Sequence, residues 1–470
     1  MGRGAVVASV VLCVALAACS STAQQGRTDL AASDGSAEVA AATDGATADA
    51  ASGAPADGNV ASVSGTAKGA TSAARTGGAA ASTAAIRIGV NYSKALGSVL
   101  TSVGGVDSTD GEAIDSIRPI VQYINDHGGI AGRKVEAVLH GVDVLEGSFS
   151  VQEQKACAAF TQDATVDAVV SGASAMGLGF TSCVARKGIP VFLELHEILD
   201  DTAFANHGGL LYQPFGISTE RQGFWIDEIA AAGYFTNAKV GVISVDDPIF
   251  ERYLDKVIRP RLAAQNVPLT QVFEFQAPGS AGDASSLYSQ ANNAVLKFRS
   301  AGITHVIFVP TGGTLPFVFM PTAENQNYRP RYAMNSYEIP AFVDLNVPAA
   351  QLKDALAVGW LPTSDVLTPQ RPQFPAERLC FNITKSRSDI PSRYCEGLFF
   401  IKAAWDASKD VSAAGLARGA RMLGDGFQSP WTFATRFGTG RTDGAAAYRL
   451  VKFDGGCECF MYSGPLKSVP

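Results

Sequence analysis

Histidine, tryptophan and positive charge are all scarce in this chain. Its 470 residues include only five histidines and four tryptophans, and 37 lysines and arginines stand against 44 aspartates and glutamates. A formal net charge of −7, with no basic stripe carrying interleaved aromatic residues, argues against nucleic acid as a partner. The histidines are too scattered to form a metal-binding motif, and we expect neither a metal nor another cofactor. They are His127, His140, His196, His207 and His305.

Complete enzyme motifs are also missing. The segment Gly172–Met176 lacks the final glycine of a nucleophile elbow. His196-Glu197 lacks the second histidine of a zinc-binding helix, and Gly177-Leu-Gly179 lacks the third glycine of a dinucleotide fingerprint. We therefore expect a protein that is not an enzyme. The alternative is a surface-anchored hydrolase, which would turn over an ester or a glycan.

Long apolar runs are absent except at the N-terminus, where Arg3 precedes a run from Ala5 to Ala17. This run is too short to span a bilayer as a mature helix and is typical of a signal peptide. It ends in Leu16-Ala17-Ala18-Cys19, which resembles the lipobox of bacterial lipoproteins. We therefore predict a signal peptide over residues 1–18 and lipidation, by palmitate among other chains, at Cys19. An ordinary secretory signal with a chance cysteine is the alternative.

The next segment lacks the large apolar side chains from which a core is built. Residues 20–85 are almost entirely Ala, Gly, Ser, Thr and Asp, which predicts that residues 19–85 form a lipidated cysteine and a disordered tether. A flexible coil of roughly 66 residues has an end-to-end distance of about 45 Å. The remaining part, Ile86 to Pro470, is too long for one ordinary core and suits two lobes.

From Ile86 onward, short apolar runs alternate with segments of helical periodicity. This alternation predicts an α/β fold with two Rossmann-like lobes, each having a parallel central sheet covered by helices. The predicted strands are 86–90, 135–139, 166–170 and 190–193 in the first series, and 239–245, 269–275, 305–310 and 332–334 in the second. Gln213–Gly216 is the predicted crossover between the series.

Helix signals and a mixed C-terminal section complete this prediction. A stripe from Ala113 to Ile124, with Pro119 expected to kink it, ends at Gly128-Gly129. Thr219 and Gln222 suggest a capping box that opens a helix towards Gly233. The other predicted elements are a helix over 287–298, a strand over 357–360, helices over 396–408 and 413–423, and a hairpin of 448–453 with 458–462. Because this last section serves both lobes, it implies a multi-strand hinge.

Six cysteines remain once Cys13 leaves with the signal peptide and Cys19 is lipidated, and we expect disulfides in an exported domain. Cys157 and Cys183 flank the strand at 166–170 and are predicted to pair, which would contribute roughly 3 to 4 kcal/mol. The other four allow three connectivities. A bridge between Cys457 and Cys459 is hard to form on an extended strand. Cys380 and Cys395 pair with each other only if the hairpin cysteines can bend; otherwise each pairs with one of those.

Several motifs resemble the type I periplasmic substrate-binding proteins, of the branched-chain amino-acid receptor or leucine-binding protein-like kind. Tyr123–Arg133, reading YINDHGGIAGR, is similar to a helix end of that family. Val166–Val170 followed by Cys183–Pro190 is a second match, and Leu287–Val309 is a third. The resemblance spans about residues 86–462. It implies one lobe of 86–213 plus about 361–445 and another of 214–360 plus about 446–470.

Members of this family capture a small molecule between their lobes and hand it to an ABC importer. The resemblance therefore implies a monomeric extracytoplasmic protein, lipid-anchored to the bacterial cell membrane, whose partners are a small-molecule ligand and an ABC-transporter permease. An amino acid, an amide or a related polar metabolite is the expected ligand. The alternative is a ligand-sensing receptor domain of the same fold that signals to a membrane partner.

Ligands of open α/β sheets bind beyond the carboxyl ends of the strands. Free amides in the loop 172–177, together with the Ser174 hydroxyl, could hold an anionic or carbonyl oxygen, although a plain tight turn is the alternative. With the family as a guide, the predicted ligand-binding residues are Ser174, Ala175, His196, Glu197, Phe250, Thr314 and Tyr337, the last beside Glu338.

Two of these loops depart from the family pattern. Amino-acid receptors have hydroxyl-rich loops that bind the α-carboxylate, whereas Ala175, Met176, Glu194 and Glu197 stand here. This puts a carboxylate ligand in doubt. Glutamates that face the cleft would favour a cationic or hydroxylated ligand, and glutamates that face solvent would have no such role.

Overall fold

The computed structural model describes residues 84–94, 110–173, 176–193, 197–280, 283, 285–309, 312–367, 371–386 and 390–470. The predicted signal peptide, the tether up to residue 83, Cys19, Ser174, Ala175, Glu194 and His196 lie outside these residues. None of the helices in the described part of the chain combines the length and the hydropathy that a membrane span requires.

A five-stranded parallel sheet organises the first half of the chain, which we call lobe 1. Its strand order is β2-β1-β3-β4-β5. The strands are β1 (Ile86–Lys94), β2 (Val135–Asp143), β3 (Ala168–Val170), β4 (Val191–Phe192) and β5 (Leu211–Tyr212). Successive residues face two different cores, because side chains alternate across a strand: Val169 joins one hydrophobic cluster and Val170 the other. Helices therefore cover both faces of the sheet.

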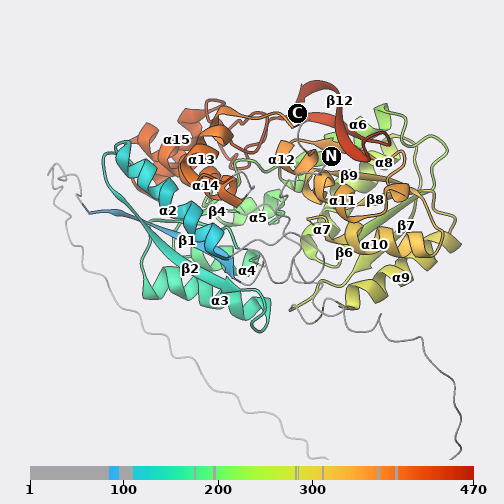
Figure 1. The fold of residues 1–470 in the computed structure, drawn as a ribbon, viewed down its shortest axis with the longest axis horizontal. Helices are drawn as coiled ribbons and strands as arrows, with labels where there is room; N and C mark the ends of the chain where they lie inside the picture. The colour runs from blue at the N-terminus through green and yellow to red at the C-terminus, as the bar shows by residue number, and fades with distance from the viewer. Residues whose placement is uncertain are drawn as a thin grey trace, which may run out of the picture. The chain divides into compact units, whose positions relative to one another are not determined.

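The two layers of lobe 1 come from distant parts of the sequence (Figure 1). One layer contains α3 (Phe149–Ala158), α4 (Leu178–Ala185) and α5 (Asp201–Asn206). The other contains α2 (Asp110–Asp126), α13 (Pro375–Thr384), α14 (Ile390–Ser408) and α15 (Ala413–Leu423). The chain thus returns to lobe 1 after completing most of the other half.

A seven-stranded sheet organises lobe 2, in the order β12-β11-β10-β9-β8-β6-β7. The strands are β6 (Val240–Val245), β7 (Leu269–Phe275), β8 (His305–Phe308), β9 (Arg331–Asn335), β10 (Leu356–Gly359), β11 (Ala447–Asp454) and β12 (Cys459–Ser468). The five strands from β10 to β7 are parallel, β11 is antiparallel to its neighbour β10, and β12 is antiparallel to β11. One large hydrophobic cluster holds this lobe together.

The helices of lobe 2 follow its strands in a repeating βα pattern, except for the first, which precedes β6 (Figure 1). They are α6 (Phe224–Ala231), α7 (Pro248–Tyr253), α8 (Arg259–Ala264), α9 (Ser285–Ser300), α10 (Thr314–Asn325), α11 (Pro340–Asn346) and α12 (Pro362–Asp365). On α9, Leu287, Ala291 and Val295 are buried, as the predicted stripe requires.

The chain passes between the two sheets after β5, after β10 and before β11. The first and third of these crossings run side by side, because Gln213 pairs with Asp443 in a parallel bridge. Gln213 N donates to Thr442 O at 2.9 Å, and Ala445 N donates to Gly216 O at 3.0 Å. The predicted crossover at Gln213–Gly216 is thus part of a hydrogen-bonded backbone pair.

The sequence signals for one predicted helix were confirmed, and the capping signal for another was wrong. In α2, Ile117, Ile120 and Ile124 are fully buried, Pro119 lies inside the helix, and Gly129 N closes the end by donating to Ile124 O at 2.8 Å. The capping box at Thr219 is wrong. Residues Thr219–Gly223 form a 3₁₀ turn, and the Gln222 amide donates to Ile217 O at 2.8 Å instead of capping.

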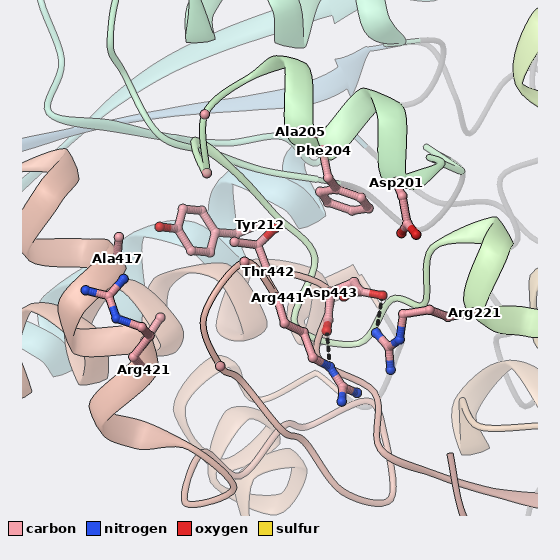
Figure 2. A pocket seen from close by; sticks show the side chains of 15 residues that line it. Asp201, Phe204, Ala205, Tyr212, Arg221, Ala417, Arg421, Arg441, Thr442 and Asp443 are labelled. Atoms are coloured by element: carbon pink, nitrogen blue, oxygen red, sulfur yellow. Dashed lines mark hydrogen bonds and ion pairs between the residues drawn. The ribbon is translucent and has the colours of Figure 1, made fainter. Parts of the chain in front are cut away.

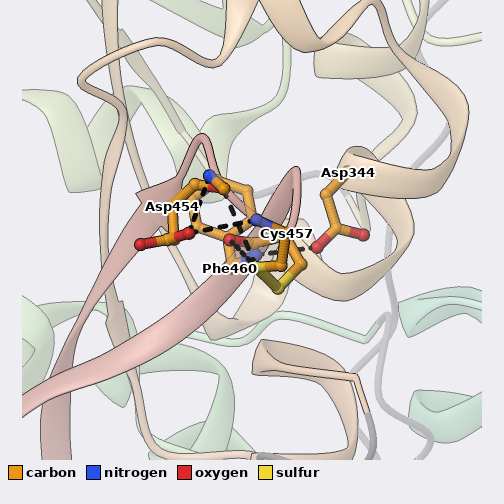
Figure 3. The surroundings of a disulfide bond; sticks show 6 residues. Asp344, Asp454, Cys457 and Phe460 are labelled. Atoms are coloured by element: carbon orange, nitrogen blue, oxygen red, sulfur yellow. Dashed lines mark hydrogen bonds between the residues drawn. A yellow bond between two sulfur atoms is a disulfide. The ribbon is translucent and has the colours of Figure 1, made fainter.

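The described residues form three disulfides, Cys157–Cys183, Cys380–Cys395 and Cys457–Cys459. The first is the predicted pair. The last is possible because Glu458 has a φ of 52°, which bends the chain out of the extended conformation. Asp454 Oδ1 supports this bend by accepting from Gly456 N and Cys457 N (Figure 3). The alternative pairing of Cys380 and Cys395 with the hairpin cysteines is therefore wrong.

Candidate functional site

A side chain of β1 accepts hydrogen bonds from the backbone of the loop after β3. Asn91 is fully buried, and its Oδ1 accepts from Gly172 N at 2.6 Å and from Ala173 N at 2.9 Å. Gly177 N, at the start of α4, donates to Glu153 Oε1 at 2.6 Å. These three amides are therefore not free for a ligand, contrary to our expectation for this loop. Ligand contact by Ser174 and Ala175 stays a prediction.

Burial raises the pKa of Glu153, which is the acceptor at the start of α4, while the amides of Gly177 and Phe180 oppose that rise. The arrangement fits a carboxylate that closes a helix end. The sequence offered no signal for it, because Glu153 lies on a different helix.

The loop after β4 leads into an ion pair between the lobes. Asp200 is fully buried and caps α5, with Oδ1 accepting from Ala203 N at 2.7 Å. Its Oδ2 accepts from Arg252 Nε of α7 in lobe 2 at 2.5 Å. Both residues were missed in the sequence, although an aspartate before a short helix is an N-cap signal. The pair joins the two lobes beside the predicted cleft.

Glu197 lies just before Asp200 and is only 5% exposed. Its backbone carbonyl accepts from Gln213 Nε2 at 3.0 Å. A solvated loop charge, which was the alternative for this residue, is therefore excluded. Its contact with a ligand stays a prediction.

In lobe 2, the predicted positions stand at the starts of two helices. Asp247 caps α7 by accepting from Ile249 N at 2.8 Å, and Phe250 follows as a half-buried ring against the lobe 2 core. Thr314 is the partly exposed first residue of α10, which has Gly313 as its N-cap at a φ of 80°. Gly313 N donates to Glu338 Oε2 at 3.0 Å, so a fully buried carboxylate lies beside Thr314.

Tyr337 is 1% exposed, and its hydroxyl hydrogen-bonds to the first crossing. It accepts from Ile217 N at 2.9 Å and lies 3.3 Å from both Gln213 Oε1 and Ile217 O. Burial raises the pKa of Tyr337, so the phenol stays neutral and can donate. A role in ligand binding stays a prediction; the contacts it makes in this structure are those of a hinge residue.

The carboxyl ends of β3, β4 and β5 also surround a cavity of about 10 Å³, room for roughly one water molecule. It is lined by Val170, Ser171, Phe192, Leu193, Pro214, Phe215, Arg393, Glu396, Gly397 and Trp431. Glu396 is 1% exposed, and burial raises its pKa to about 8. In the described part of the chain, no three His, Cys, Asp or Glu side chains gather as a metal site.

No protein-family model matches the chain, and no curated protein matches it in sequence. Solved structures match it in fold. An ABC transporter substrate-binding protein from Desulfitobacterium hafniense, in complex with Leu, is 17% identical with a TM-score of 0.52, and the match covers 81% of this chain and 100% of that one. A solute-binding protein of an ABC transporter from R. palustris, in complex with 4-hydroxybenzoate, is 10% identical with a TM-score of 0.58 over 82% and 98%.

A branched-chain amino acid ABC transporter protein from Thermus thermophilus, with bound valine, is 13% identical with a TM-score of 0.59, and the match covers 82% of this chain and 97% of that one. These likenesses span nearly the whole length of each solved protein. The chain therefore has the two-lobe α/β fold of the type I periplasmic binding proteins, as its sequence motifs predict.

Proposed function

We propose that this protein is an extracytoplasmic solute-binding protein, anchored by lipid on Cys19, which captures a small polar molecule between its lobes and delivers it to an ABC importer. The observation that carries the proposal is the pair of separately cored α/β lobes joined by three chain crossings. Such an arrangement suits capture by hinge closure, in which the occupant is enclosed and no covalent step is needed.

The contacts between the lobes include an ion pair and hydrogen bonds, whose polar groups can be solvated when the lobes open. Besides the Asp200–Arg252 pair, Phe149 N donates to Gly279 O at 3.0 Å, and Asp201 N donates to Glu220 Oε2 at 2.9 Å. In this pair Arg252 is 35% exposed and Asp200 is fully buried, so opening of the lobes would return both charged groups to water. A ligand that binds both lobes can therefore shift the balance between open and closed forms.

The described polar groups and the ligands of the solved proteins support a proposed ligand class. Those proteins hold leucine, valine or 4-hydroxybenzoate, each of which has a carboxylate and an apolar portion. In this chain Phe250 offers an apolar face, whereas Glu338 and Glu197 bring buried carboxyl groups to the neighbouring loops. We propose an amino acid, an amide or a related polar metabolite that has a hydrogen-bond donor for these groups.

A thermal-shift and calorimetry screen of the mature protein tests this proposal. The panel contains branched-chain and polar amino acids, amides, polyamines, sugars and hydroxybenzoates. A ligand at a hundredfold its Kd should stabilise the protein by about 2.7 kcal/mol. If no compound in the panel produces a shift, the capture function is refuted for these classes.

A matched pair of variants then locates the site. Phe250 and Phe235 are both half-buried rings against the lobe 2 core, but Phe235 lies at the opposite, amino-terminal side of β6. Phe250→Ala should weaken binding of the identified ligand at least tenfold, and Phe235→Ala should leave it unchanged. Equal effects of the two variants would show that the loss comes from general destabilisation and would remove Phe250 from the site.

A further inference from the structure

A second, much larger cavity lies in lobe 1, away from the carboxyl ends of its central strands. It has a volume of about 640 Å³ and lies at the free edge of β5, between α5 and α15 (Figure 2). The loop 438–443, which belongs to the third crossing, forms part of its wall. Its charged and aromatic lining residues are Asp201, Phe204, Tyr212, Arg221, Arg421, Arg441 and Asp443.

Positive charge predominates in this cavity, although the whole chain is acidic. Of the two aspartates, Asp443 is already engaged by Arg221 Nη1 and by Ser218 N. Arg441 donates only to the backbone carbonyls of Asp443 and Ala445, at 3.2 Å and 3.0 Å, among the contacts of the described residues. Arg421 is exposed on α15 and has no ion pair within the described part of the chain. Two guanidinium groups thus lack a carboxylate partner.

Two buried hydrogen-bond donors at this cavity have no acceptor among the described residues, which also favours an anionic occupant. The Tyr212 hydroxyl has no hydrogen-bond partner among the described residues, although the side chain is fully buried, and the same is true of the buried Arg221 Nη2. The Tyr212 ring stacks on Phe192 with centroids 5.2 Å apart, which fixes the direction of the hydroxyl. In Figure 2 this hydroxyl lies on the same side of the cavity as Arg421. An acceptor supplied from outside would satisfy these donors.

Burial and neighbouring guanidinium groups shift the pKa values of two residues that line the cavity, Arg441 and Tyr212. Burial, together with the charges of Arg221 and Arg436, lowers the pKa of Arg441 to about 10, although Asp443 opposes the change. Burial raises the pKa of Tyr212 to about 12, and the guanidinium of Arg421 opposes this rise. Burial is the largest cause of both shifts, and the neighbouring guanidinium groups make a smaller contribution of the sign that a positive potential produces.

We propose that this cavity is a second binding site, which takes an anion with two or more terminal oxygens, such as a phosphate or carboxylate group. Guanidinium groups bind such anions in bidentate fashion, and a phenol hydroxyl adds a neutral donor. The cavity exceeds the size of one small ion, and Phe204 offers an apolar face, so the anionic group of an organic molecule also fits. The inference is independent of the ligand that occupies the cleft between the lobes.

Calorimetric titration of the mature protein tests the site with two probes, inorganic phosphate and phenyl phosphate, each at the same ionic strength as a sodium chloride control. Binding of phosphate alone would assign the site to the inorganic ion. Tighter binding of phenyl phosphate would assign it to an organic anion that uses Phe204. Binding of neither probe at millimolar concentration would overturn the proposal.

Variants on α15 separate a specific site from general attraction. Arg421→Gln removes a cavity arginine, and Arg418→Gln removes an arginine one turn away that pairs with Asp410 and does not line the cavity. We expect Arg421→Gln to weaken binding of the bound probe at least tenfold, and Arg418→Gln to change it less than twofold. Tyr212→Phe should weaken binding severalfold. Equal losses in the two arginine variants would mean nonspecific electrostatics and would also overturn the proposal.

Discussion

Replacing Glu396 by glutamine should change how the stability of this protein depends on pH. Glu396 is buried in lobe 1, accepts from Ser429 Oγ at 2.7 Å and has a pKa raised to about 8 by burial. Its unfolded value is 4.5. Between these values the folded protein holds a proton that the unfolded chain releases, so the stabilisation present below pH 4.5 is lost as pH rises towards 8.

The size of this effect follows from the linkage relation. Each pKa unit corresponds to about 1.4 kcal/mol, so the free energy of unfolding should fall by about 5 kcal/mol across the whole window. Glutamine keeps the acceptor for Ser429 and cannot ionise. When the free energies of unfolding of the two proteins are each taken relative to pH 4.5, that of Glu396→Gln should therefore exceed that of the wild type by about 3 kcal/mol at pH 7.

Guanidinium unfolding of both proteins between pH 4.5 and 8.5 measures this difference directly. Other buried carboxyl groups, such as Asp344 and Asp365 with pKa values raised to about 7, contribute equally to both proteins and cancel. Glu136→Gln, on the exposed side of β2, is the control and should show no such difference. A stability difference between Glu396→Gln and wild type that stays flat with pH would refute the reasoning.

Two further predictions concern the links within and between the lobes. The double variant Cys157→Ser with Cys183→Ser opens a loop with a sequence separation of 26 and should lower the free energy of unfolding by roughly 3 to 4 kcal/mol, measured in urea; a loss below about 1 kcal/mol would contradict the chain-entropy argument. Tyr337→Phe leaves the amide of buried Ile217 without its acceptor and should cost about 1 to 3 kcal/mol in the same assay, whereas Tyr123→Phe on α2 should not; equal losses would deny Tyr337 its role at the crossing.

Periodic segments were predictable because the spacing of their apolar residues shows which face of a helix or strand is buried. The stripe of α2, the longer strands of both lobes and the pairing of Cys157 with Cys183 follow from spacing and order alone. Elements that depend on tertiary contacts were not predictable. Strand β5 has only two residues, Leu211 and Tyr212, and Thr219 opens a 3₁₀ turn because Gln222 bonds to the crossing rather than to its own helix.

The placement of the loops that hold the predicted site residues was predictable, and the contacts of those loops were less so. Strand order places the loops after β3 and β4 at one edge, and motifs identify that edge. The partners of those loops come from elsewhere in the chain: Asn91 holds one loop, and Arg252 binds Asp200 across the lobes. The arginine-lined cavity is still harder to foresee, because Tyr212, Arg421 and Arg441 share no motif and meet only through folding.

The side-by-side backbones at Gln213–Gly216 and Thr442–Ala445 have a mechanical consequence. Two strands tied by hydrogen bonds resist sliding past each other, because sliding would break the bonds between them, whereas both can bend together without losing any. Relative motion of the lobes should therefore be a rotation with its pivot at this pair, not a translation. With such a pivot, one angle describes how far the two lobes are open. Distance measurements between two labels, one on each lobe, would follow that angle.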